Sequence, residues 1–326
     1  MFDIYFAPEY GEICEFIDSG KCEIFQFQST SGTIKNMYIK REIPWKIDSK
    51  RYFDIITPYG YGGPIICEAI NKEQLIQEYY QAFQKHCDEN DIVCEFVRFH
   101  PIYKNYEDFQ DIYKTVYLRH TVGTNLKEYD DPIQNEFSKS TRRDIRKSLE
   151  KGVECSIHLA PHDWTIFKKL YNETLERNHA AIQYFFPDEY YEKINLLLGS
   201  DTLEIRAHYK NEVIASEMYF IRGNLMHAHL LGSSDKLFEL NAGALLEATA
   251  VKWGKEHNFH YIHHGGGRSN EPQDALYMYK KKFGKNTNFD FYIGKKIWNK
   301  KLYDQFVMMS GNEETKNEDF FPLYRL

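Results

Sequence analysis

Two periodicities alternate along the first half of the chain. Runs in which β-forming residues alternate or cluster predict five strands, at 22–28, 37–43, 52–56, 92–99 and 112–120. Apolar positions recur at helical spacing over 72–89, which predicts one long helix. Three glycines and two prolines between 57 and 64 exclude a regular element there. The predicted order is three strands, a glycine-rich loop, a helix and two strands.

The second half has a clearer pattern of the same kind. Its predicted strands are 153–159, 202–209, 212–221, 225–231, 259–263 and 287–293. Its predicted helices are 162–179, 187–198, 241–257, 272–283 and a last one near 296–308. This order, βααβββαβαβ, is typical of the α+β class, with a mixed but mainly antiparallel sheet flanked by helices.

Much of that order recurs in the first half, which predicts a structural duplication. We therefore expect two domains, 1–152 and 153–308, with the tail 309–326 returning to pack on the first.

Composition and charge exclude several classes of protein. The net charge of −7 argues against a DNA-binding protein. The six cysteines contain no C-x-x-C pair and all lie in the first half, which is typical of free thiols in a reducing cytoplasm. The first residues form no basic and apolar leader, and no apolar run is long enough to span a bilayer. We expect a cytoplasmic protein, with a peripheral position at the inner membrane face left open.

A basic helix stands out against this acidic background. Over 139–151, six basic and two acidic residues give a local charge of +4. Ser138 can cap its start and Gly152 its end, and an apolar stripe is expected through Ile145, Leu149 and Val153. Two basic stripes flank it, formed by Arg142 with Arg146 and by Arg143 with Lys147. The run is either a solvated face or a contact for phosphate or tRNA.

Several familiar chemistries lack their residues. His227 and His229 face the same side of a predicted strand, but no carboxylate or cysteine stands at a recognised companion spacing, so no metal site is predicted. There is no G-x-S-x-G for a serine nucleophile and no G-x-G-x-x-G for a dinucleotide.

The triplet Gly265, Gly266 and Gly267 is more informative. Three residues without Cβ at the end of a strand leave backbone N–H groups free to approach an oxyanion, although a tight structural loop would need the same residues. Lys280, one helix further on and next to Tyr279, can stabilise a developing negative charge. Tyr59 and Gly60 of the first glycine-rich loop, together with Arg98, are further candidates for substrate binding.

At these residues the sequence resembles a known family. The element order is similar to the GNAT acyltransferase fold. Two such domains in tandem look like the FemABX peptidyltransferases, which attach amino acids from aminoacyl-tRNA to the peptide of cell-wall precursors. The segments that carry the resemblance are 141–147 with 152–153, Thr174 with Arg177, 209–215, 229–232, 265–267 and 279–284. The last is similar to the family's F-K-x-x-F-G.

The resemblance implies roles for particular residues. Lys280 takes the place of the family's lysine near the peptidyl-transfer site, while Arg177 and Tyr184 would face the substrate cleft. His229 and Tyr279 are further candidates for substrate binding. The chain also departs from the family: it has no coiled-coil arm and no Trp-rich opening, and Tyr279 replaces the usual Phe. The run 239–244, where the helix 241–257 begins, offers only one glycine, so weak binding of coenzyme A is expected.

The resulting hypothesis is an acyltransferase that forms an amide bond in a cleft between the two domains. It would transfer an aminoacyl or acyl group to an amine of a peptide or cell-wall precursor, including a lipid-linked precursor at the membrane. The donor would be aminoacyl-tRNA or acyl-CoA, with no tightly bound cofactor. His229, His264, the tyrosines or the substrate itself could remove the amine proton. The alternatives are an acyl-CoA-dependent N-acetyltransferase and a non-catalytic module that binds a peptide or glycan.

Overall fold

The computed structural model describes residues 2–271, 273–314 and 320–326. Its contacts divide the chain into unit 1, formed by Arg119–Phe289 and the residues up to Ile4, and unit 2, formed by Tyr5–Leu118 and Asp290–Leu326. This division differs from the predicted boundaries at 152 and 308. The chain passes from one unit to the other within two strands, β6 (Lys114–Asn125) and β12 (Asn288–Ile297). The two ends of each of these strands therefore belong to different units.

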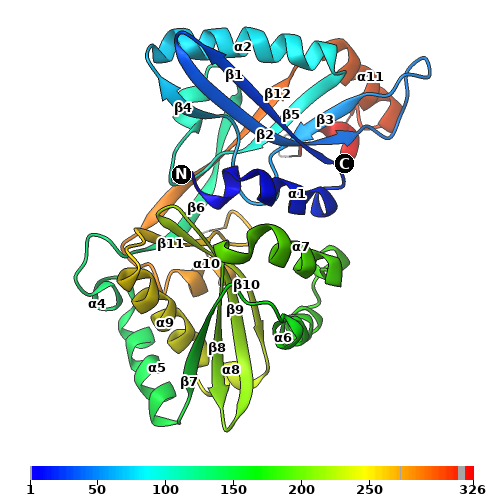
Figure 1. Ribbon diagram of the computed structural model, residues 1–326. Coiled ribbons are helices and arrows are strands. Elements are labelled where there is room, and N and C mark those ends of the chain that lie inside the picture. Colours follow the sequence, from blue (N-terminus) through cyan, green and yellow to red (C-terminus); the bar gives the residue numbers. More distant parts are fainter. Residues whose placement is uncertain (1, 272, 315–319) are drawn as a thin grey trace. The chain divides into compact units, whose positions relative to one another are not determined.

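Unit 2 is a mixed sheet covered by helices (Figure 1). Its strands lie in the order β1 (Lys21–Ser29), β2 (Gly32–Glu42), β3 (Phe53–Ile56), β5 (Ile92–Arg98) and β12, with β4 (Ile65–Ala69) paired to β2. Only β3 and β5 among these pair in parallel. The helices are α1 (Pro8–Ile17), α2 (Lys72–Glu89), α3 (Tyr106–Phe109) and α11 (Lys300–Ser310), with short turns η1 (Ile4–Phe6) and η4 (Leu323–Arg325).

The long helix α2 covers one face of this sheet because its apolar positions lie on one side. Leu75, Tyr79 and Phe83 are buried in a cluster with Ile55 and Val97 of the strands. The end of the chain also packs on unit 2. Tyr324 is buried among residues of β5 and α11, and its hydroxyl donates to Asp54. Residues 315–319 of the acidic tail lie outside the described residues.

A buried carboxyl group lies at the centre of unit 2. Glu95 of β5 is 1% exposed and accepts hydrogen bonds from Asn36 Nδ2 at 2.9 Å, Tyr113 Oη at 3.0 Å and Trp298 Nε1 at 3.2 Å. Burial raises the pKa of Glu95 to about 7, although these three donors act in the opposite direction. The folded chain therefore retains a proton on Glu95 at pH values where the unfolded chain has released it.

Stability should accordingly fall as pH rises from about 4.5 to about 7, and level off above that range. We expect Glu95→Gln to remove on the order of 2 kcal/mol of this pH dependence. Glutamine can keep the acceptor for Tyr113 and Trp298. Urea unfolding of both proteins at pH 5 and pH 8 would check this. An unchanged difference between the two pH values in the variant would contradict the assignment.

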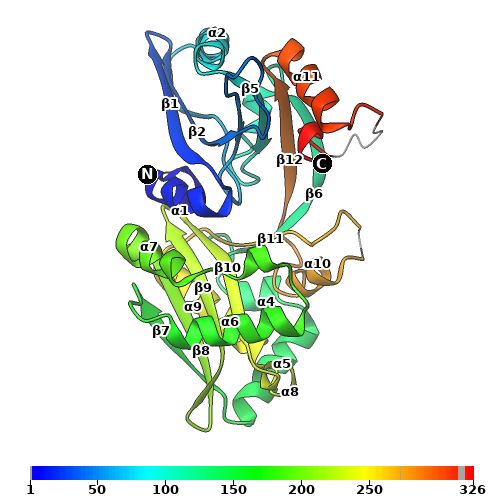
Figure 2. The same cartoon turned by 90° about the vertical axis from the view of Figure 1, so that its right-hand side faces the viewer.

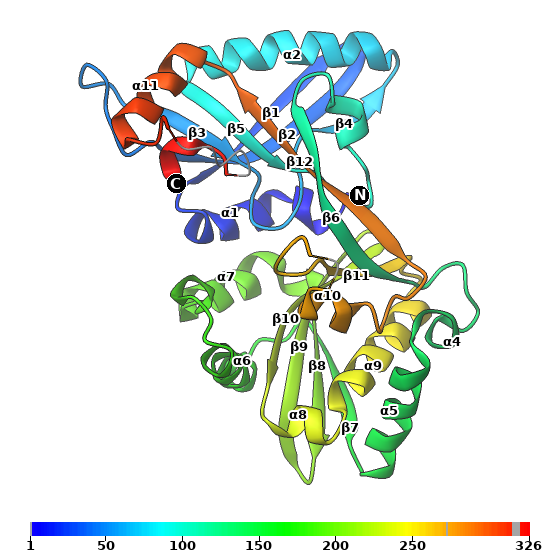
Figure 3. The ribbon, with the colours of Figure 1, turned by 180° about the vertical axis from the view of Figure 1, so that it is seen from behind.

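Unit 1 is likewise built on mixed strands, with helices on both faces (Figures 2 and 3). Its strands lie in the order β6, β11 (Tyr261–Gly265), β10 (Leu225–Ser233), β9 (Glu212–Arg222), β8 (Thr202–Tyr209) and β7 (Glu154–Leu159). One face carries α6 (Thr165–Arg177) and α7 (Asp188–Leu198), and the other carries α5 (Lys139–Glu150) and α9 (Ala242–Glu256). The remaining elements are α4 (Pro132–Glu136), α8 (Lys236–Glu239), α10 (Ala275–Lys280), η2 (Ile182–Tyr184) and η3 (Gly199–Asp201).

The predicted fold class, α+β with mixed and mainly antiparallel sheets flanked by helices, is confirmed. The predicted helix 272–283 is shorter than expected, since α10 covers Ala275–Lys280 and residue 272 lies outside the described residues. The predicted last helix begins later, at Lys300, because β12 continues to Ile297. Within the described residues, no helix is both long and apolar enough to cross a membrane.

Candidate functional site

The site in unit 1 begins where the parallel strands β10 and β11 stop pairing. They are in register only from Leu225 with Tyr261 to His227 with His263. One extra residue then interrupts each strand, His229 in β10 against β9 and His264 in β11 against β6. Such bulges redirect side chains and end pairing. Gly265 follows with a φ of +74°, a conformation that favours glycine, and lets the chain leave the sheet.

The glycine triplet and Lys280 are brought together at the end of β11. Lys280 is the last residue of α10, and its Nζ donates a hydrogen bond to the Gly266 carbonyl at 2.9 Å. The Gly267 carbonyl accepts a hydrogen bond from Arg119 at 2.6 Å. The triplet thus contacts the two cations through its carbonyl oxygens. That the N–H groups of the triplet bind an oxyanion remains a prediction.

The loop between the triplet and α10 is held by Asp274. Its carboxylate accepts from the backbone N–H groups of Arg268, Ser269 and Tyr277, at 3.1, 2.9 and 2.9 Å. These bonds, with the one from Tyr277 having the largest effect, lower the pKa of Asp274, and the Tyr277 bond caps the start of α10. The loop therefore gives Lys280 a defined position against Gly266.

Two buried carboxyl groups accompany Lys280. Glu217 of β9 and Glu247 of α9 are 6% and 5% exposed, and the hydroxyl of Tyr219 approaches Glu247 Oε2 at 3.5 Å. Burial raises the pKa of Glu217 to about 7 and that of Glu247 well above its usual range, while the charge of Lys280 acts against both shifts. Burial lowers the pKa of Lys280 to about 8, against the attraction of both carboxyl groups and Asp274. Lys280 itself is half-buried, and the three groups form an ionisable cluster.

Sequence reasoning missed Glu217 and Glu247. Each carries the only charge in an otherwise uncharged and largely apolar run, 214–221 for the strand and 242–251 for the helix. A single carboxylate inside such a run is costly to bury without a partner. A lone acidic residue in an apolar run was therefore the sequence feature that could have identified Glu217 and Glu247.

The histidine candidates are poorly suited as bases. Burial lowers the pKa of His229 to about 3, and burial with the nearby Lys280 charge lowers that of His264 to about 3. Imidazoles of such low basicity are weak acceptors for the proton of an amine. His229 also contacts Phe220 and the Tyr190 hydroxyl at 2.7 Å. Phe220 and Tyr219 alternate along β9, so His229 lies on the opposite face from the Lys280 cluster.

Arg177 and Tyr184 lie on the side of the unit 1 sheet that α6 and α7 cover, Arg177 at the end of α6 and Tyr184 in η2. Arg177 donates to the carbonyl and the hydroxyl of Ser233, at 2.9 and 3.1 Å, and pairs with Asp235 at 3.3 Å. It therefore binds the end of β10. Tyr184 is 41% exposed in η2. Tyr279, in contrast, lies beside the cluster, in contact with Phe283 of the core.

Tyr59, Gly60 and Arg98 all lie in unit 2, where they stabilise the first glycine-rich loop. The backbone of Tyr59 binds Asp18 and the hydroxyl of Tyr10. Gly60 has a φ of +102°, and a Cβ there would come within 2.4 Å of the Tyr5 ring. Arg98 binds Thr57 through its guanidinium and its backbone N–H. These contacts explain the residues structurally, and their role in substrate binding stays a prediction.

The basic helix α5 keeps most of its charges in solvent. Arg143, Arg146 and Lys147 are exposed, whereas Arg142 turns back to donate to the Phe137 and Gln134 carbonyls. The expected apolar stripe is wrong at Leu149, which is 55% exposed. The buried residues of the helix are Thr141 and Ser148 instead, and the helix packs against α9.

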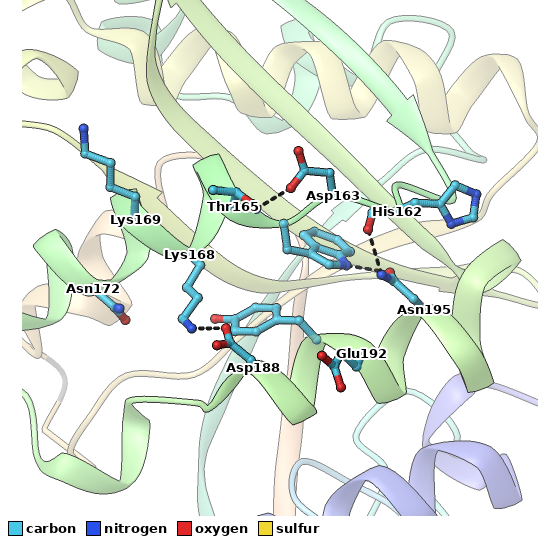
Figure 4. A pocket seen from close by; sticks show the side chains of 11 residues that line it. His162, Asp163, Thr165, Lys168, Lys169, Asn172, Asp188, Glu192 and Asn195 are labelled. Atoms are coloured by element: carbon cyan, nitrogen blue, oxygen red, sulfur yellow. Dashed lines mark hydrogen bonds and ion pairs between the residues drawn. The ribbon is translucent and has the colours of Figure 1, made fainter.

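A polar hollow lies between α6 and α7 (Figure 4). Its lining repeats at helical spacing on both helices and comprises His162, Asp163, Trp164, Thr165, Lys168, Lys169, Asn172, Asp188, Tyr191, Glu192 and Asn195. Lys168 pairs with Asp188 across it, and Asn195 links the Trp164 ring to the His162 carbonyl. None of the predicted site residues lines this hollow.

Comparison with known proteins places these features in context. Residues 104–200 match the model of the FemAB family. The sequence matches no curated protein. The fold is similar to the crystal structure of FemX, with 13% identity and a TM-score of 0.71 over 93% of this chain and 94% of that chain.

Two further solved structures share the fold. The C-terminal domain of a putative lysylphosphatidylglycerol synthetase from Agrobacterium fabrum has 11% identity and a TM-score of 0.59, over 92% of this chain and 90% of that chain. L-PGS from Bacillus licheniformis has 13% identity and a TM-score of 0.54, over 90% and 94%. The FemAB family model thus matches one stretch of the chain, and the fold is similar to that of FemX along nearly the whole length.

Proposed function

We propose that this protein is an acyltransferase that forms an amide bond by moving an aminoacyl or acyl group to an amine. The family match and the FemX fold support a transferase of this class. The observation that carries the proposal is the position of Lys280, held at the end of β11 by the Gly266 carbonyl beside two buried carboxyl groups. The acceptor would be the amine of a peptide or cell-wall precursor, free or lipid-linked.

In this reaction the amine attacks an activated carbonyl, a C–N bond forms and the acyl–oxygen or acyl–sulfur bond breaks. Negative charge develops on the carbonyl oxygen, and the Lys280 ammonium is the group placed to stabilise it. The amine also loses a proton. Because His229 and His264 are weak bases here, the departing oxygen or sulfur of the donor is the better acceptor for that proton.

A donor screen tests this proposal. Purified protein would be offered charged tRNA or acyl-CoA species together with peptide amines, and amide products would be measured by mass spectrometry. Amide formation from charged tRNA alone would support a FemX-like reaction. Turnover with acetyl-CoA, together with a thermal shift on binding it, would favour the N-acetyltransferase alternative. Tight peptide or glycan binding without turnover from any donor would overturn the transferase proposal.

The exposed charges of α5 give a separate prediction about the donor. If tRNA is the donor, reversing Arg143, Arg146 and Lys147 to glutamate should lower kcat/KM for charged tRNA by about tenfold or more and reduce its salt dependence. Reversal of the exposed Lys85, Lys300 and Lys301 of unit 2 changes the net charge equally and serves as the control. Equal losses in both variants would mean that α5 has no specific role.

A further inference from the structure

The hydroxyl of Thr124 determines the tautomer of His264. Thr124 Oγ1 lies 2.8 Å from His264 Nε2 and 2.8 Å from the Phe283 carbonyl oxygen. A carbonyl oxygen can only accept, so the single hydroxyl proton must point to Phe283. The hydroxyl oxygen is then an acceptor for His264, and His264 must carry its proton on Nε2.

Burial and the charge of Lys280 lower the pKa of His264 to about 3, so the ring is neutral at pH 7 and its other nitrogen has a lone pair. This Nδ1 faces Glu247 Oε1 at 3.5 Å. Both residues are buried, with His264 2% and Glu247 5% exposed. An ionised Glu247 would set negative charge against that lone pair in a low-dielectric environment. A proton on Glu247 converts the repulsion into an attraction.

We infer that Glu247 is a neutral carboxylic acid in the working protein, and that Glu217 is the carboxylate that balances the Lys280 ammonium. Glu217 is thus a positioning residue, which keeps Lys280 charged without touching the substrate. The kinetic part of this inference rests on the proposed transferase function; the protonation states do not.

The remaining groups around the cluster agree with this assignment. Burial and the charge of Glu217 both favour the neutral form of Glu247, while the charge of Lys280 favours an ionised Glu217. The titratable groups that act on the cluster are Glu217, Tyr219, Glu247, His264, Asp274, Tyr279 and Lys280. Among them, only Glu217 and Asp274 are left to carry negative charge beside Lys280 at neutral pH.

Two isosteric substitutions should therefore have different effects. Glu217→Gln removes the charge that favours the ammonium, so Lys280 should titrate about one pH unit lower. Glu247→Gln replaces a neutral acid by a neutral amide, which can still donate to His264 Nδ1 and accept from Tyr219, so Lys280 should titrate as in the unchanged protein. NMR of lysine-labelled protein would follow this titration directly, without any substrate.

Kinetics and spectroscopy complete the test. Above the Lys280 pKa, Glu217→Gln should lose about tenfold more activity than Glu247→Gln, with an alkaline limb moved to lower pH. Infrared spectra at pH 7 should lose a neutral carboxylic acid band on Glu247→Gln, and ¹⁵N NMR should show His264 protonated at Nε2. An ionised Glu247 at pH 7, or equal shifts of Lys280 in both variants, would overturn the inference. A failure of the transferase proposal would instead leave the spectra intact and remove turnover from the unchanged protein.

Discussion

Lys280→Ala is expected to lower amide formation by about 10²–10³-fold while leaving the fold intact. The loss should appear mainly in kcat, because an ammonium that stabilises the oxyanion acts in the transition state rather than on the bound substrate. The fold should survive because Nζ makes one hydrogen bond, to a loop carbonyl, and because the buried Glu217 can take up a proton once the lysine charge is gone. Steady-state kinetics with the donor found in the screen, together with circular dichroism and thermal melting, would measure both effects.

Lys282→Ala is the matched control for this change. Lys282 lies two residues further along the chain, is exposed, and places its Nζ over the Tyr279 ring at 5.8 Å. The control removes the same charge from the same segment, so its activity should stay within about twofold of the starting protein. Full activity in Lys280→Ala with the true substrates would remove Lys280 from the reaction and leave it as a loop anchor.

Gly284→Ala should destabilise unit 1 by more than about 3 kcal/mol, and we expect little folded protein to be recovered. A Cβ at this position would lie 2.1 Å from the Gly123 carbonyl oxygen and 2.9 Å from its carbon. Both atoms belong to the backbone of β6, so no side-chain rotation can relieve the clash. Soluble yield and chemical unfolding of the purified variant would measure the effect.

Gly199→Ala provides the comparison, because nothing lies within 4 Å of a Cβ built there. That variant should unfold within about 0.5 kcal/mol of the starting protein. A stable Gly284→Ala protein would show that the segment after Phe283 can move away from β6. As the structure stands, the Phe-Gly pair that ends the predicted motif serves packing, with Phe283 in the core and Gly284 against β6, while Lys280 faces the ionisable cluster.

Most of the helices and strands could be predicted because their signal is local. The 3.6-residue period of α2 and the short apolar runs of β8 to β10 depend only on which side of each element faces the core. The division into units could not be predicted, because β6 and β12 each belong to two units and no feature of a strand's own sequence records which neighbour each end will pair with.

The candidate site shows the same limit. Lys280 and the glycine triplet could be predicted because they lie close together in a recognisable motif. The carboxyl groups beside Lys280 come from β9 and α9, some 63 and 33 residues away along the chain, and are distinctive only once they are buried. The basicity of His229 and His264 could not be predicted either, because β-bulges and burial, rather than composition, determine where they point and how basic they are.

Local patterns in the amino-acid sequence are therefore enough to predict the α+β class, the order of most elements and the basic helix, and to select Lys280 as a candidate site residue. Three-dimensional packing alone establishes that two acids share the surroundings of Lys280, that the tautomer of His264 depends on a threonine 140 residues away, and that Gly284 must lack a side chain. The physical reason is that the periodicity of an element is a short-range property. Desolvation and steric contact, in contrast, arise between segments that meet only when the sheet of unit 1 has formed.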